Sequence, residues 1–400
     1  MEARPWNKGP HRAVATSGIR EERLPLRGPP LEIAARLGFG ARGLVYCLIG
    51  GLALLAAFGA GGGTGGSRTA LRSLMSQPFG WILLGLMAVG LLFKVGAAPF
   101  HAWTPDVYQG APTAVTAFMA ACTKIAAFGA LMRVFYVAFG GASWDWRPLM
   151  WVVAILTMVV GSVIAITQTD VKRMLAYSSI AHAGFVLVGF AGVYAGAGDV
   201  VGVTSVSSVL FYLAAYGFST IGAFAIVTLV RDAGGETTAL SRWAGLGREA
   251  PVLAGTFAFF LLAFAGIPLT SGFIGKWAVF AAAWAGGAWP LVVVAVVMSA
   301  VAAFFYVRVI VAMFFSDPVG ITPAVAVPSI LTTGVITVTA LATVALGVVP
   351  GPVLDLAQQA GAFVRRSWAP DRRQPRWPCE WATPTCRGAS RSGSPSSRSS

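Results

Sequence analysis

The chain has 400 residues, of which 56% are hydrophobic and only 11% are charged, and its mean hydropathy is +0.73. A soluble protein of this length needs more charged side chains on its surface, so the composition excludes an ordinary soluble enzyme and indicates a bilayer protein. The net charge of +14 comes mostly from the two ends of the chain. No basic face on a folded domain accompanies them, so we predict contact with anionic lipid headgroups and no nucleic-acid partner.

Residues 1–43 mix Arg, Pro and Gly without a helical period, and the first 30 lack the apolar run of a cleavable signal peptide. Residues 351–400 form a basic tail rich in Arg, Ser and Pro. Both ends are predicted to be disordered, although translation of a GC-rich gene in a wrong frame would give the same pattern. A transmembrane domain over 44–350 is expected between them.

Nine apolar runs in this domain are long enough to cross a bilayer. They cover 44–60, 81–110 with an interruption, 113–139, 149–168, 174–195, 205–230, 251–283 with an interruption, 289–314 and 328–350. The acidic residues between these limits all fall in or beside predicted loops, where an uncompensated carboxylate is tolerated. The fold class predicted is therefore an all-α polytopic membrane protein.

Three lysines lie inside the predicted spans, namely Lys94, Lys124 and Lys276. A lysine at the centre of a span costs roughly 2.5–3.5 kcal/mol on insertion scales, which indicates a functional use. Alternatively, a lysine near a helix end can extend its stem and reach the interface, as we expect for Lys172 and Arg308. This alternative does not fit Lys124, which has more than two apolar turns on either side.

An amine in a dry interior can be charged or neutral, depending on neighbouring charge, so buried lysines can relay protons. His182, within "YSSIAHAGFVLVGF", is the candidate shuttle between them. A structural histidine bonded to a backbone carbonyl is the alternative. Further side chains could hold water or protons near these groups: His101, Thr123, Tyr177, Ser178, Ser179 and Ser271.

Two of the lysines lie close to a proline that would interrupt a helix. Pro99 follows Lys94 by five residues, and Pro268 precedes Lys276 by eight in "AGIPLTSGFIGKW". Irregular backbone within a bilayer is tolerated where it lines a polar cavity, although a kink made for packing is the alternative. The two interrupted spans are five spans apart, so they are predicted to belong to two repeats with inverted orientation.

Soluble catalysis finds no support in the motifs. The Gly-rich stretch "GAGGGTGGS" at 59–67 lacks the Lys-Ser/Thr ending of a phosphate-binding loop. The cysteines form no metal-ligand or disulfide pattern, and no Ser/His/Asp order appears. We therefore predict no metal and no cofactor in this chain.

Four stretches resemble a known family: "FKVGAAPFHAWTPDVYQGAPT", "TKIAAFGALMRVF", "QTDVKRMLAYSSIAHAGFVLVG" and "LAGIPLTSGFIGKW". They are similar to subunit N of the bacterial proton-pumping NADH:quinone oxidoreductase (respiratory complex I), an antiporter-like membrane subunit. The resemblance covers about Leu44 to Arg365.

The resemblance implies a fourteen-helix fold with two inverted five-helix repeats, placed in the cell inner (plasma) membrane. It implies that Lys94, Lys124 and Lys276, with His182, form a hydrophilic axis that moves protons. NADH, FMN, iron–sulfur clusters and quinone would belong to partner subunits, and the other membrane subunits, the bilayer and the quinone pool would be the partners. The protein would then be an enzyme only as a subunit of the translocase.

The nine predicted spans would match the sixth to fourteenth helices of this family, so the first repeat would be incomplete. The acid that the family pairs with its first lysine would be missing, and Glu32 lacks the apolar surroundings to replace it. Two other functions therefore stay open: a stand-alone cation/proton antiporter component, and a non-functional truncated fragment.

Overall fold

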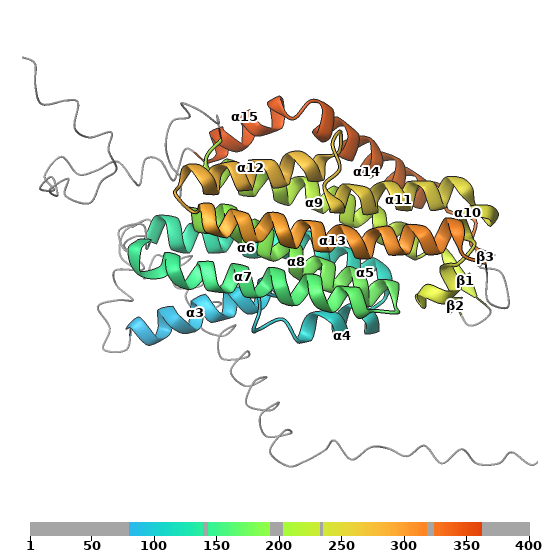
Figure 1. Cartoon of the computed structure of the whole chain (residues 1–400), viewed down its shortest axis with the longest axis horizontal. Helices are drawn as coiled ribbons and strands as arrows, with labels where there is room; N and C mark the ends of the chain where they lie inside the picture. Colours follow the sequence, from blue (N-terminus) through green and yellow to red (C-terminus); the bar gives the residue numbers. More distant parts are fainter. Residues whose placement is uncertain (1–79, 139–142, 193–202, 233–234, 318–323, 362–400) are drawn as a thin grey trace, which may run out of the picture. The chain divides into compact units, whose positions relative to one another are not determined.

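The computed structural model describes residues 80–138, 143–192, 203–232, 235–317 and 324–361. They all belong to one compact unit, which spans residues 66–400, and they are almost entirely helical (Figure 1). The helices are α3 (Gly80–Val95), α4 (Trp103–Gly110), α5 (Thr113–Phe118), η1 (Met119–Thr123), α6 (Lys124–Met132), η2 (Arg133–Ala138), α7 (Ser143–Thr167), α8 (Val171–Gly192), α9 (Ser205–Val227), η4 (Leu240–Trp243), α10 (Leu246–Glu249), α11 (Pro251–Ala265), α12 (Ser271–Ala285), α13 (Trp289–Phe315), α14 (Ile330–Val348) and α15 (Gly351–Ala360).

Six helical segments of the described residues are long and apolar enough to cross a membrane. They are Thr113–Tyr136, Trp146–Thr167, Val171–Gly192, Ser205–Val227, Trp289–Phe315 and Ile330–Val348. The two predicted interrupted spans appear as pairs of shorter helices, α3 with α4 and α11 with α12. The first predicted span, 44–60, lies outside the described residues.

Local sequence signals set several helix ends. Thr204 and Ser207 form a reciprocal capping box at the start of α9. Pro251 opens α11, where its missing N–H costs no hydrogen bond, and the Ser329 hydroxyl accepts a hydrogen bond from the Thr332 amide at the start of α14.

Both interrupted helices end in the same way. α3 stops at Gly96, with φ of 78°, and α11 stops at Gly266, with φ of 86°. In each case the next amide reaches back five residues, from Ala97 to the Leu92 carbonyl and from Ile267 to the Leu262 carbonyl. This is the Schellman arrangement, which requires a left-handed residue and so favours glycine.

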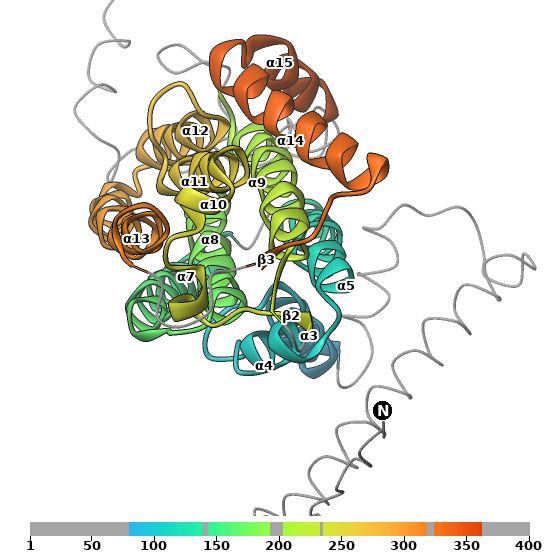
Figure 2. The ribbon, with the colours of Figure 1, turned by 90° about the vertical axis from the view of Figure 1, so that its right-hand side faces the viewer.

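Helix α8 lies at the centre of the bundle, surrounded by α7, α9, α12 and α13 (Figure 2). It is 94% buried, whereas α14 on the periphery is only 22% buried. The helices that surround α8 bear apolar side chains on their outer faces, as expected of faces turned toward lipid.

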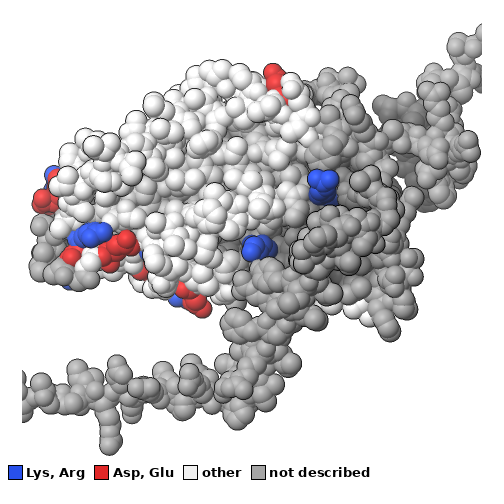
Figure 3. All heavy atoms as spheres, turned by 180° about the vertical axis from the view of Figure 1, so that it is seen from behind, with Lys and Arg blue, Asp and Glu red and all other residues white. Residues whose placement is uncertain are grey.

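On the face drawn in Figure 3, many of the charged side chains lie at one end, and a few others lie elsewhere. Two exposed ion pairs join separate segments of the described chain, Arg173 with Asp106 at 3.2 Å and Arg248 with Asp317 at 2.8 Å. Most of the remaining described surface on this face is uncharged, which is the pattern of a membrane-embedded protein.

A small antiparallel sheet was not expected from the sequence. It consists of β1 (Val230–Asp232), β2 (Gly235–Glu236) and β3 (Ala324–Val325), in the order β2-β1-β3. Arg231 pairs with Glu236 on one side and with Ala324 on the other. The sheet joins the connections that follow α9 and α13, and runs of two or three residues are too short to show a strand pattern in sequence.

Residues 351–360 do not follow the prediction of a disordered tail from 351 onward. Residues 351–360 form α15, because Val353 and Leu354 pack against the buried side chains of Phe211 and Leu346. The prediction missed it because the helix is short and polar on its outer side. Residues 362–400 and the predicted disordered segment 1–43 lie outside the described residues.

Candidate functional site

Lys124 is buried in the bundle, with 4% of its surface exposed. Its Nζ donates a hydrogen bond to the backbone carbonyl of Ser179 on α8 and lies 5.8 Å from the centre of the Tyr216 ring. The side-chain hydroxyl of Ser179 lies 3.3 Å from the Tyr108 hydroxyl. The ammonium therefore faces the protein interior and does not extend toward an interface.

The helix around Lys124 is not a regular α-helix. The π-helical turn η1 ends immediately before Lys124, and a second π-helical segment, η2, follows α6. Wider turns of this kind rotate the following side chains and recur at functional sites. The apolar sequence Met119–Thr123 gave no signal of this change.

His182 is buried on α8, with 4% of its surface exposed. Its Nδ1 lies 2.7 Å from the Tyr212 hydroxyl, and its Nε2 lies 3.0 Å from the Tyr306 hydroxyl. Both ring nitrogens therefore meet hydroxyl groups that can donate or accept a proton, rather than the backbone carbonyl of the structural alternative. The Tyr216 ring lies against both His182 and Lys124, and the Phe185 ring lies against both His182 and Lys276.

Lys276 is buried on α12, with 5% of its surface exposed. Its Nζ donates hydrogen bonds to the Ala265 carbonyl and the Ser299 hydroxyl, both at 2.8 Å, and lies 5.0 Å from the centre of the Phe185 ring. Ala265 is the last residue of α11, where carbonyls lack helical partners and the helix dipole is negative. The helix break thus supplies the acceptor that holds the buried amine.

A small cavity lies beside His182. It is lined by His182, Tyr212, Ala215, Tyr216, Ser219, Ala263, Phe264, Gly272 and Gly275. It leaves about 10 Å³ for the centre of a water molecule, which is close to the space that one water needs. Polar groups from α8 and α9 thus meet at a place that can be hydrated.

The side chains predicted to hold water or protons near the buried lysines divide into two groups. Ser178 and Ser179 do join the buried groups, since the Ser178 hydroxyl bonds the Tyr306 hydroxyl and the Ser179 hydroxyl bonds the Tyr108 hydroxyl. The backbone carbonyl of Ser179 accepts the hydrogen bond from Lys124. Thr123 instead donates to the Met119 carbonyl of its own helix, at 2.5 Å. His101 Nδ1 and the Ser271 hydroxyl are buried without a hydrogen-bond partner among the described residues, and the half-buried Tyr177 makes no hydrogen bond there.

Four further side chains were missed by the sequence reasoning: Tyr212, Tyr216, Ser299 and Tyr306. The three tyrosines occur inside apolar helices, where a hydroxyl needs a partner, and that could have marked them. Ser299 carried no such signal, because a serine can bond its own helix.

Lys94 stands apart from this cluster. It lies in the last turn of α3, two residues before Gly96, and its side chain is exposed. Within the described ranges it makes no hydrogen bond or ion pair. The place of Lys94 in the hydrophilic axis therefore stays a prediction, because α3 lies at the edge of the described bundle and no described helix covers this side.

The two prolines mark the helix breaks as expected. Pro99 follows a cis peptide bond in the turn between α3 and α4. Pro268 lies in the exposed connection between α11 and α12, before Leu269, whose φ is 72°. The carbonyl of Leu269 approaches α14 so closely that a Cβ on Gly347 would lie 2.4 Å from it.

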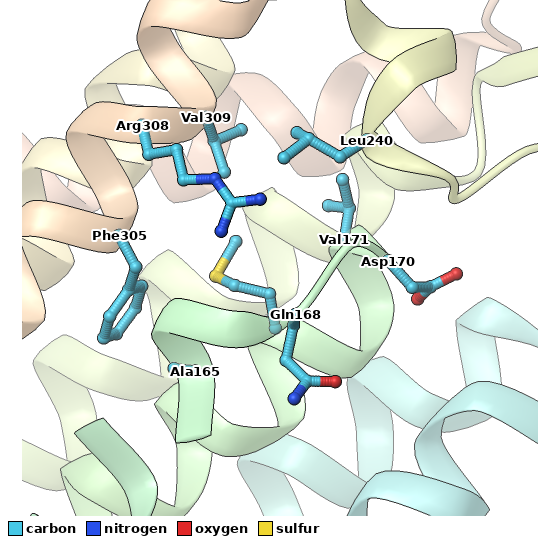
Figure 4. A pocket seen from close by; sticks show the side chains of 9 residues that line it. Ala165, Gln168, Asp170, Val171, Leu240, Phe305, Arg308 and Val309 are labelled. Atoms are coloured by element: carbon cyan, nitrogen blue, oxygen red, sulfur yellow. The ribbon is translucent and has the colours of Figure 1, made fainter. Parts of the chain in front are cut away.

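Lys172 and Arg308 both bond backbone carbonyls near helix ends, and their extension toward the membrane interface stays a prediction. Lys172 is buried and donates a 2.9 Å hydrogen bond to the Ala111 carbonyl, just beyond α4. Arg308 donates to the Ile166 carbonyl near the end of α7 and borders a second small cavity with Gln168 and Asp170 (Figure 4). Both cations therefore satisfy carbonyls at helix ends.

The described residues contain no group of His, Cys, Asp and Glu arranged to hold a metal ion. Hydroxyls, amines and one imidazole make up the buried cluster, so proton transfer is the chemistry that its side chains support.

Comparison with known proteins identifies the family. The family described as "NADH:quinone oxidoreductase/Mrp antiporter, TM" matches residues 44–303. The chain belongs to this family. It is 63% identical over 287 residues to NADH-quinone oxidoreductase subunit N of Parafrankia sp. (strain EAN1pec), a match that covers 71% of this chain and 53% of that relative. The chain thus spans about half the length of the curated relatives that it matches.

Solved structures of the family agree with this assignment. A chain of respiratory complex I from Thermus thermophilus with bound aureothin is 34% identical, with a TM-score of 0.58 over 78% of this chain and 67% of that chain. A chain of the Mrp complex from Dietzia sp. DQ12-45-1b is 21% identical, with a TM-score of 0.67 over 84% of this chain and 70% of that chain. The second likeness concerns the fold alone.

Proposed function

We propose that the chain is a membrane proton-translocating subunit of an NADH:quinone oxidoreductase, in which Lys124, His182 and Lys276 relay protons. The observation that carries this proposal is the position of His182, which shares an aromatic neighbour with each buried lysine and holds a tyrosine hydroxyl at each ring nitrogen. The family assignment and the relative named subunit N support the same function.

The relay would work by shifting charge between amines. A lysine that loses its proton can take another from a neighbouring donor, and the imidazole with its two hydroxyl partners can pass a proton in either direction. Burial makes each charged amine sensitive to the charge of the others. A charge arriving at Lys124 would therefore favour release of a proton at Lys276.

The two helix breaks would provide the surroundings of this axis. Because α3–α4 and α11–α12 share the glycine-ended break, and lie five spans apart in the predicted sequence of spans, we infer two repeats with inverted orientation. Lys94 would exchange protons with Lys124 at the first break. Lys276 would exchange protons with one membrane surface.

The protein would not catalyse a reaction alone. NADH, FMN, iron–sulfur clusters and quinone would be bound by partner subunits, whose electron transfer would supply the free energy. Other membrane subunits of the complex, the bilayer of the bacterial plasma membrane and the quinone pool would be its partners.

The Mrp-like fold suggests a cation/proton antiporter component as the alternative function. The residues at the buried site argue against direct binding of sodium or potassium. Hard cations prefer several oxygen ligands, carboxylates above all. The described residues place amines and an imidazole at the site, and no carboxylate is among the groups that contact Lys124, His182 or Lys276.

Inverted membrane vesicles that contain the assembled oxidoreductase test the function. Addition of NADH should acidify the vesicle interior, and replacement of this chain by Lys124→Ala should lower the acidification while a native gel shows the complex intact. Cation exchange by the purified chain in liposomes, without NADH, would favour the antiporter instead.

A further inference from the structure

One arginine outside the proposed relay bonds the ends of two helices. Arg147, near the start of α7, donates from Nε to the Ala191 carbonyl at 3.2 Å, and from one terminal nitrogen to the Gly192 carbonyl at 3.1 Å. The same nitrogen donates to the Gly286 carbonyl at 2.9 Å. Gly192 ends α8, and Gly286 follows the last residue of α12.

These carbonyls are suitable acceptors for a guanidinium group. The last carbonyls of a helix have no helical partners, and the helix dipole makes that end partly negative. The planar fork of arginine can serve several acceptors at once, which an ammonium group does less well. Arg147 therefore satisfies two helix ends with one side chain.

Other side chains reach the end of α8 but not that of α12. The Tyr136 hydroxyl donates to the Phe190 carbonyl at 2.6 Å, and the Trp151 indole donates to the Ala191 carbonyl at 3.4 Å. The α8 end is thus held by three side chains, so loss of Arg147 would leave it partly capped. Among the described residues, Arg147 is the side chain that bonds both helix ends.

The two helix ends touch through their backbones. A Cβ on Gly286 would lie 2.2 Å from the Gly192 carbonyl oxygen, and a Cβ on Gly192 would lie 2.6 Å from Ala283 Cα. Only glycine allows this approach. The hydrogen bonds of Arg147 thus lie beside a close backbone contact between α8 and α12.

The far end of α12 adjoins this contact. Its near end begins after the break at residues 266–270, where the helical hydrogen-bond ladder is interrupted. α12 carries Lys276, and α8 carries His182. An anchor at the far end of α12 fixes the direction of the helix and with it the place of Lys276.

We propose that Arg147 is a positioning residue that ties α12 to α8 and thereby holds Lys276 in reach of His182. This inference rests on the proposed proton-transfer function. If Arg147 only capped α8, its loss would lower the amount of assembled complex and leave proton transfer within each complex unchanged.

The test compares Arg147→Gln and Arg147→Lys with the parent chain in the assembled oxidoreductase. Arg248→Gln is the matched control, because Arg248 forms an exposed pair with Asp317. Hydrogen–deuterium exchange should become about tenfold faster at residues 283–288 in Arg147→Gln, as a local contact opens. In Arg147→Gln, the number of protons moved per NADH oxidised should fall about twofold or more, because transfer depends on placement. Arg147→Lys should give a ratio between those of Arg147→Gln and the parent. Arg248→Gln should keep the ratio of the parent.

A second variant changes the contact while it keeps the arginine. Gly286→Ala should give the same two effects, because its Cβ would meet the Gly192 carbonyl. Gly334→Ala on α14 is its control, since no atom lies within 4 Å of the added Cβ. The two glycine variants also show whether a fall in the ratio follows from the contact rather than from a lost charge.

Each outcome bears on a different part of the proposal. Unchanged exchange in Arg147→Gln would overturn the tie between the helices. Faster exchange with an unchanged proton-to-NADH ratio would overturn the positioning role. Absence of NADH-driven proton transport in the parent would contradict the proposed function instead, and the exchange rates would still decide whether Arg147 ties the two helix ends.

Discussion

Lys276 and Ala265 meet across a helix break, with the lysine Nζ 2.8 Å from the carbonyl oxygen of the last residue of α11. The two residues are eleven positions apart in sequence, yet α12 turns back so that its own lysine caps the preceding helix. A protonated amine is favoured at this negative helix end, and a neutral amine keeps the Ser299 hydroxyl as a partner. At this break, the positive charge of Lys276 therefore helps to cap the last turn of α11.

Lys276→Arg should preserve the positive charge and the helix cap but abolish the relay. A guanidinium group stays protonated at any pH at which the protein functions. We expect the protons moved per NADH oxidised to fall about tenfold or more, in line with the contribution of a general acid or base. The measurement is vesicle acidification alongside NADH oxidation. A ratio equal to that of the parent would show that Lys276 need not lose its proton.

Gly266→Ala should destabilise the break. Gly266 has a φ of 86°, and an added Cβ would lie 3.0 Å from Lys276 Cδ, so the variant combines backbone strain with a steric conflict. The expected cost is about 1–3 kcal/mol, seen as a lower thermal unfolding midpoint of the purified chain in detergent. Gly255→Ala within α11 is the control, because nothing lies within 4 Å of its added Cβ; equal midpoints for the two variants would contradict the strain argument.

Tyr306→Phe should impair proton transfer with little effect on packing. The change removes the hydroxyl that lies 3.0 Å from His182 Nε2 and also bonds Ser178, while the ring stays against Phe264 and Phe305. The expected fall in the proton-to-NADH ratio is about tenfold. Tyr177→Phe serves as control, since the Tyr177 hydroxyl makes no hydrogen bond in the part of the chain described. If both variants pumped alike, Tyr306 would have no part in the relay.

The long apolar helices could be predicted from sequence because a bilayer imposes a length and a composition on each of them. The two breaks were also visible, since Pro99 and Pro268 stand near glycines that end helices. The π-helical turn before Lys124, the short sheet and α15 left no such signature. They depend on contacts between distant segments, as when Val353 packs near Phe211.

Part of the site could also be predicted from the sequence. Lys124, Lys276 and His182 were marked by the cost of a polar group in an apolar run, and the structure buries all three. Lys94 is exposed in the described part of the chain, and its part in the axis stays a prediction because burial depends on which helices cover α3. The tyrosines on α9 and α13 were missed, because a tyrosine in an apolar helix is common and only the fold shows which hydroxyls face His182.

The most direct measurement of the central claim is the proton-to-NADH ratio of Lys124→Ala in inverted vesicles, with assembly followed on a native gel. Lys124 donates to the Ser179 carbonyl deep inside the bundle, and no described residue offers a replacement amine beside it. The account predicts an assembled complex whose proton-to-NADH ratio falls about tenfold or more. An assembled complex with the parent's full ratio would contradict a relay through the buried lysines.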